Sequence, residues 1–93
     1  MVIGTLRASL FLRDAHSLKD KRQVLKALKD RVHNEFNVSI AEIEDQDLWQ
    51  KVSVGVAVVS NDSKHALSVL SSVERFLKMF PPLEFCESET EIL

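Results

Sequence analysis

Cysteine is almost absent from this chain of 93 residues, and Cys86 is its single thiol. One cysteine excludes an internal disulfide and any metal site built from several cysteines, and it fits a reduced, cytoplasmic setting. Long apolar runs are also absent, since none approaches the roughly 18 residues that a membrane-spanning helix needs. The first residues carry no basic stretch and enter a strand pattern at once, so we expect neither a signal peptide nor contact with a membrane.

The sequence also lacks linkers, internal repeats and low-complexity segments. Its hydrophobic content of 45% and charged content of 28% are ordinary for a globular protein and distant from the disordered class. Residues 1–93 are therefore expected to form a single domain.

Charge is distributed unevenly, although the net charge is only −2. Residues 17–36 contain six basic and three acidic side chains, whereas residues 37–50 and 83–93 each contain four acidic side chains and no basic one. Because the chain is not basic overall, a general nucleic-acid coat protein is disfavoured.

Alternating apolar residues predict strands over residues 2–13, 38–44, 51–61 and 83–89. The run 51–61 is the most strand-like, with Val52, Val54, Val56 and Val58 on one face and small residues on the other. Charged residues near the end of the second strand and in the fourth suggest that these two strands lie at the sheet edges.

Two segments repeat apolar residues at helical spacing. In the first, Ser17 is a candidate N-cap and the expected buried stripe is Leu18, Leu25, Leu28, Val32 and Phe36. The second runs from the caps available at residues 61–63 to the helix-ending pair Pro81 and Pro82.

The resulting order, β-α-β-β-α-β, predicts a two-layer α/β (α+β) domain of the ferredoxin-like type. Its four-stranded antiparallel sheet has strand order 4-1-3-2, with both helices on one face. This fold hosts RNA-recognition modules and acylphosphatases. Base stacking on the sheet is disfavoured, because Gly55 and Ala57 occupy positions where aromatic rings would be needed. A phosphate cradle is disfavoured too, because residues 13–16 (RDAH) contain no glycine.

No catalytic or metal-binding constellation is visible, so we expect a protein without enzymatic activity, metal or cofactor. The histidines at 16, 33 and 65 lie in different predicted elements. The loop that contains Asp45, Asp47 and Trp49 is interpreted as an acidic turn with the tryptophan folded over one end of the core. A small-ligand or hydrolytic site in this loop is a weaker alternative.

Two surfaces are candidates for function. The first is a basic flank beside the buried stripe of the first helix, consisting of Lys19, Arg22, Lys26, Lys29 and His33. It either binds RNA phosphates or is a solvated helix face whose lysine stems cover the core edge. The second is the open sheet face, a candidate oligomer interface consisting of Ile3, Thr5, Phe11, Ser53, Gly55, Ala57 and Val59.

Four motifs resemble the YlxP-like family of small uncharacterised bacterial proteins: residues 17–22 (SLKDKR), 36–42 (FNVSIAE), 46–50 (QDLWQ) and 55–62 (GVAVVSND). The resemblance covers nearly the whole chain and implies a ferredoxin-like fold. Genes of this family often lie beside those for translation initiation and ribosome-maturation factors, which implies a role near translation by association. It implies no catalytic residues.

The leading hypothesis is a non-enzymatic cytoplasmic factor that contacts ribosomal RNA or a ribosomal subunit through the basic flank. The alternative is a homodimeric protein-interaction module that uses the open sheet face.

Overall fold

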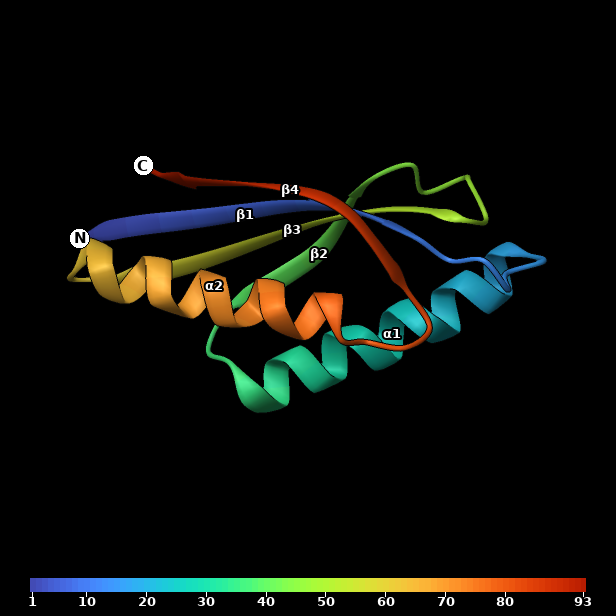
Figure 1. The fold of residues 1–93 in the computed structure, drawn as a ribbon, viewed down its shortest axis with the longest axis horizontal. Coiled ribbons are helices and arrows are strands. Elements are labelled where there is room, and N and C mark those ends of the chain that lie inside the picture. Colours follow the sequence, from blue (N-terminus) through green and yellow to red (C-terminus); the bar gives the residue numbers. More distant parts are fainter.

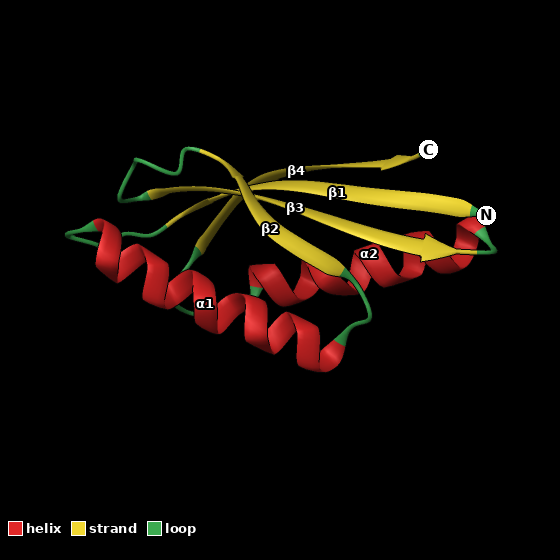
Figure 2. Cartoon of the chain, turned by 180° about the vertical axis from the view of Figure 1, so that it is seen from behind, coloured by secondary structure: helices red, strands yellow, loops and turns green.

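The computed structural model describes residues 1–93 and contains six elements, in the predicted order. They are β1 (Val2–Phe11), α1 (Leu18–Glu35), β2 (Ser39–Glu44), β3 (Lys51–Ser60), α2 (Ser63–Lys78) and β4 (Glu84–Ile92). The sheet is antiparallel throughout, with order β2-β3-β1-β4, and both helices cover the same face (Figures 1 and 2). The predicted fold class, topology and strand order are confirmed.

Strand alternation builds the core. The valines at even positions of β3 and the even residues of β1 from Leu6 to Leu10 are buried beneath the helices, and they form one cluster with Leu28 and Val32 of α1 and Leu70 and Leu77 of α2. Burying apolar area is the main favourable term in folding, so this alternation fixes which sheet face the helices cover.

Side-chain caps set the helix starts. The Ser17 hydroxyl accepts a hydrogen bond from the Asp20 amide at 3.1 Å, as the sequence predicted. The Asp62 carboxylate accepts one from the Lys64 amide at 3.3 Å. The second helix ends at Lys78, three residues before the first proline.

Aromatic contacts orient α1 relative to α2. The guanidinium of Arg31 lies 5.5 Å from the ring centre of Phe76 and 5.7 Å from that of Phe80, and Phe36 meets Phe76 edge to face. The side of α1 that carries Arg31 therefore faces α2. The opposite side faces solvent beyond edge strand β2, against which α1 packs.

Irregularities occur in both edge strands. The register shifts between Glu42 and Glu44 of β2, and opposite Ser9 and Leu10 where β4 pairs with β1. The sequence predicted a fourth strand over residues 83–89, but β4 continues to Ile92 because β1 offers pairing partners as far as Gly4. Neither helix has the length and apolarity needed to cross a lipid bilayer.

Candidate functional sites

The basic flank lies on the solvent-facing side of α1, away from Arg31. Lys19, Arg22, Lys26 and His33 are exposed, and Lys29 is partly buried. Lys26 pairs with Asp30 at 3.2 Å, one helical turn later on a well-exposed surface. Such an exposed pair contributes only about 0.3–0.5 kcal/mol, so the Lys26 ammonium can exchange Asp30 for another anion at little cost. No carboxylate lies within ion-pairing distance of Lys19, Arg22 or Lys29.

Lys21 occupies a core position on the same helix, with only 1% of its surface exposed. Its ammonium lies 2.7 Å from the Glu42 carboxylate and donates to the carbonyls of Asp45 and Leu48, each at 2.7 Å. The ammonium is therefore hydrogen-bonded to two carbonyls and forms an ion pair with the carboxylate. Lys21 thus joins α1 to β2 and to both ends of the β2–β3 turn.

Sequence reasoning missed this role, although a signal was present. Lys21 stands three residues after Leu18 and four before Leu25, so it continues the apolar stripe at helical spacing. A charged residue in such a stripe predicts a buried partner, since an unpaired buried charge costs several kcal/mol.

The β2–β3 loop is an ordered turn. Asp45 has a φ of 62°, a left-handed conformation that aspartate tolerates better than most residues. Its carbonyl also accepts a hydrogen bond from the Leu48 amide at 3.0 Å, and its carboxylate lies 3.8 Å from Lys51. No group of three or more histidine, cysteine, aspartate or glutamate side chains is placed to hold a metal ion.

Trp49 corrects one expectation. Instead of folding over the end of the core, its side chain is 53% exposed at the loop tip, next to exposed Leu48. Beneath the loop, the Lys21 ammonium binds the carbonyls of Asp45 and Leu48, so backbone atoms of the loop face the core at this point.

The open sheet face has an apolar half and an acidic half. Ile3, Thr5, Phe11, Gly55 and Ala57 are half-buried on it, and Val59 is 65% exposed. Ser53 is buried, so it is less accessible than its predicted interface role needs.

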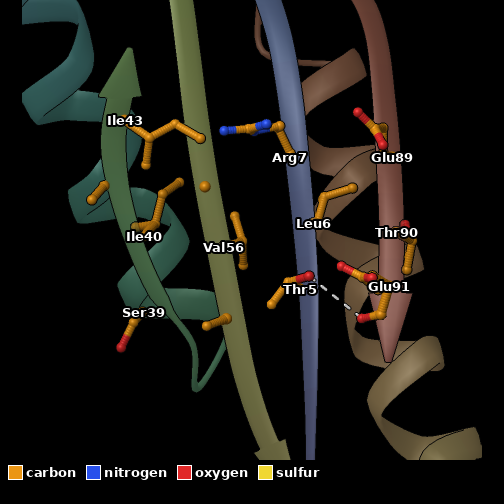
Figure 3. Close-up of a pocket in the computed structure, with 13 residues that line it drawn as sticks. Thr5, Leu6, Arg7, Ser39, Ile40, Ile43, Val56, Glu89, Thr90 and Glu91 are labelled. Atoms are coloured by element: carbon orange, nitrogen blue, oxygen red, sulfur yellow. Dashed lines mark hydrogen bonds between the residues drawn. The ribbon is translucent and has the colours of Figure 1, made fainter. Parts of the chain in front are cut away.

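A hollow of about 640 Å³ lies over the apolar half, and Figure 3 shows residues from all four strands around it. Ile43 overhangs Gly55 on one side, while Arg7 and Glu89 border the other. The Arg7 guanidinium pairs with Glu44 at 2.9 Å.

Three glutamates on β4 form the acidic half: Glu87, Glu89 and Glu91. They lie opposite Ser9, Arg7 and Thr5 on the open face, and all are exposed. Sequence reasoning noted these acids but could not align them, because the bulge in β4 sets which of its residues share a face.

Comparison with known proteins places the chain. Residues 3–90 match a family described as "Protein of unknown function (DUF503)". The chain is 43% identical over 90 residues to "Uncharacterized protein YlxP" of Bacillus subtilis (strain 168), which covers 97% of this chain and 98% of that protein. Among solved structures, "De novo designed protein Foldit4" is similar over 99% of this chain and 92% of that one, with a TM-score of 0.48 and 18% identity. The resemblance to YlxP-like proteins is confirmed, and this chain belongs to the DUF503 family.

Proposed function

We propose that this protein is a non-enzymatic cytoplasmic factor that binds the phosphate backbone of RNA, in the first place ribosomal RNA, through the basic flank of α1. The observation that carries the proposal is a set of three cations on one side of α1 that have no carboxylate partner: Lys19 and Arg22, which are exposed, and Lys29, which is partly buried. A purely solubilising helix surface commonly interleaves both signs as pairs one turn apart, and this flank contains one such pair.

The length of the flank suits a polyanion. Lys19 and Lys29 are ten residues apart, which corresponds to about 15 Å along a helix. Four lysine and arginine side chains over this length can each neutralise a phosphate and release counterions. For a single strand, the logarithm of the association constant should then fall with the logarithm of salt concentration with a slope of about −3.

The test compares two charge-matched double variants. Lys26→Glu/Lys29→Glu reverses two charges on the flank, and Lys64→Glu/Arg75→Glu reverses two exposed charges on α2. Both should unfold within about 1 kcal/mol of the wild type, because substitutions at surface positions, of which only Lys29 is partly buried, have small effects. Only the flank variant should lose association with ribosomal subunits in co-sedimentation and show a shallower salt dependence with a labelled ribosomal RNA fragment.

Two results would contradict the proposal. If the wild-type protein binds neither ribosomal subunits nor RNA at low salt, the proposed RNA-binding function is wrong. If the two double variants bind RNA equally well, the basic flank is not the RNA-binding site.

A homodimer formed through the open sheet face is a second candidate, supported by the exposed Val59 and the apolar hollow beside it. If β4 of one protomer packed on β4 of the other, their glutamates would repel one another. In the dimer, β4 of one protomer would therefore lie across β2 of its partner. Ala57→Glu should leave the fold intact, because this side chain points away from the helices, and should dissociate the dimer. Sedimentation velocity at high micromolar concentration decides, and a monomeric wild type would rule the dimer out.

A further inference from the structure

The tip of the β2–β3 loop presents the single tryptophan of the chain beside a second aromatic ring. Trp49 is more than half exposed, and with Phe11 and Leu48 it lines a hollow of about 440 Å³. Gln50, Lys51 and Asp47 complete this hollow. The hollow is shallow and open to solvent.

The loop holds this aromatic tip in a fixed place. Lys21 binds the carbonyl of Leu48, the residue before Trp49, and the backbone amide of Leu12 donates to the Gln50 carbonyl at 2.7 Å, just after it. The Gln50 side chain donates to the Arg13 carbonyl at 2.9 Å. An exposed ring on an anchored backbone loses little conformational freedom when it binds a partner.

The tip and the start of the basic flank lie at the same end of the molecule. Lys21, which contacts the loop directly, stands between Lys19 and Arg22 in the chain. Figures 1 and 2 show the loop next to the first turn of α1. A strand of RNA that follows the flank toward the N-terminus of α1 therefore arrives at the loop.

The charges around the hollow favour a base over a phosphate. Lys51 also lines the hollow, but its ammonium lies 3.8 Å from the Asp45 carboxylate. Asp47 has no cation within ion-pairing distance, so it repels a phosphate there. It can accept a hydrogen bond from the amino group of a base. Aromatic rings that stack bases beside a cationic track are the usual components of single-strand binding sites.

We propose that Trp49 stacks on an unpaired base, so that the RNA recognised by this protein is single-stranded where it crosses the β2–β3 loop. This inference rests on the proposed function, because the basic flank supplies the phosphate contacts. The stacking site is then the β2–β3 loop, which has an exposed aromatic ring, and not the sheet face, which lacks the rings that stacking needs.

The absence of any other tryptophan and of tyrosine makes the test direct, since intrinsic fluorescence then reports Trp49 alone. The probes are a uridine oligomer of about 12 nucleotides, within the usual site size for single strands, and its duplex with an adenosine oligomer. The single strand should quench Trp49 fluorescence as it binds. The duplex should bind through the flank without quenching, because its bases are already stacked.

Three substitutions separate stacking from apolar contact, with affinity measured by anisotropy of labelled RNA. Trp49→Ala should weaken single-strand binding about tenfold or more and leave duplex binding unchanged. Trp49→Phe should retain most of the affinity, and Trp49→Leu should not, since leucine offers area without an aromatic face. Thermal melting should show all three folded, because the side chain is exposed.

The outcomes distinguish this inference from the proposed function. If both RNAs bind, yet fluorescence stays unchanged or Trp49→Ala binds the single strand as tightly as the wild type, stacking is wrong and the flank proposal stands. The same conclusion follows if ribosomal subunits quench Trp49 while the RNA oligomers that bind do not, because the ring then contacts a protein. If neither oligomer binds, stacking is wrong, and the proposed function fails with it only if the wild type also binds neither ribosomal subunits nor the ribosomal RNA fragment.

Discussion

At the scale of single residues, the two glycines of the chain have similarly tight surroundings, but a side chain should be tolerated at Gly55 and not at Gly4. A Cβ at Gly4 would lie 2.9 Å from Leu70 Cδ1, and a Cβ at Gly55 would lie 3.0 Å from Ile43 Cγ2. Leu70 is fixed in the core, whereas Ile43 lies at the surface of the open face and can turn away. The mobility of the neighbour therefore decides the energetic cost of a methyl group.

Gly4→Ala is expected to destabilise the protein by about 1–3 kcal/mol, because it overpacks a filled core. Gly55→Ala should change stability by no more than about 1 kcal/mol, and in either direction, because alanine also restricts the unfolded chain. Urea denaturation of the two variants measures the difference. If Gly55→Ala proved as costly as Gly4→Ala, Ile43 would be held more firmly than its exposure indicates.

Residue-level prediction from sequence succeeded where one local rule acted alone. The Ser17 cap and the face of each valine in β3 followed from local geometry and alternation. The burial of Lys21 was missed and the position of Trp49 was predicted wrongly, because lysine is usually exposed and tryptophan is usually buried. Their true positions depend on Glu42 and on two loop carbonyls, which approach only after the hairpin has folded onto α1.

At the scale of secondary-structure elements, the contact between Lys21 and Glu42 joins α1 to the β2–β3 hairpin. The Glu42 side chain retains 19% exposure, so water relieves part of its desolvation. Breaking a buried pair from one side is costly, because it leaves the other charge without a partner.

Lys21→Met should destabilise the protein by about 3 kcal/mol, because it leaves the Glu42 carboxylate and the Leu48 carbonyl without a partner. Lys19→Met is the control, and it should stay within about 0.5 kcal/mol of the wild type. Adding Glu42→Leu to Lys21→Met should restore part of the loss, since no unpaired charge remains. Chemical denaturation measures all three, and equal stability of Lys21→Met and Lys19→Met would contradict a structural role for the ammonium.

Element order and sheet topology were predictable because hydrophobic period, helix caps and the handedness of crossovers all agreed. The acidic row of β4 was not, because a bulge opposite Ser9 and Leu10 adds one residue and exchanges the faces of the strand beyond it. The alternation of apolar and polar residues in the sequence cannot by itself locate such an insertion. The boundary between the apolar and acidic halves of the open face therefore emerged only from the paired register.

At the scale of the whole molecule, positive and negative charge lie at opposite edges of the sheet. The basic flank projects beyond β2, and the glutamates lie on β4 at the other edge. Three strand spacings separate these edges, about 14 Å, which exceeds the Debye length of about 8 Å at physiological salt. Ordinary salt should thus screen β4 from a ligand on α1.

Glu87→Lys/Glu89→Lys should change the affinity for duplex RNA, which contacts only the flank, less than about twofold at physiological salt, because screening is nearly complete over this distance. At about 0.01 M salt, where the Debye length is about 30 Å, the same variant should bind RNA more tightly than the wild type. Anisotropy titrations at the two salt concentrations provide the measurement. A large gain at physiological salt would show that the RNA passes over β4.

The burial of Lys21 also divides the lysines by chemical reactivity. An amine inside the core, hydrogen-bonded to two carbonyls and paired with a carboxylate, cannot reach an acylating reagent while the chain is folded, whereas Lys26 and Lys64 can. In mass spectrometry after brief acylation, Lys21 should gain label only on unfolding, which makes it an internal standard for native protein. Against that standard, protection of Lys26 but not of Lys64 by ribosomal subunits would map the contact to α1 without any substitution.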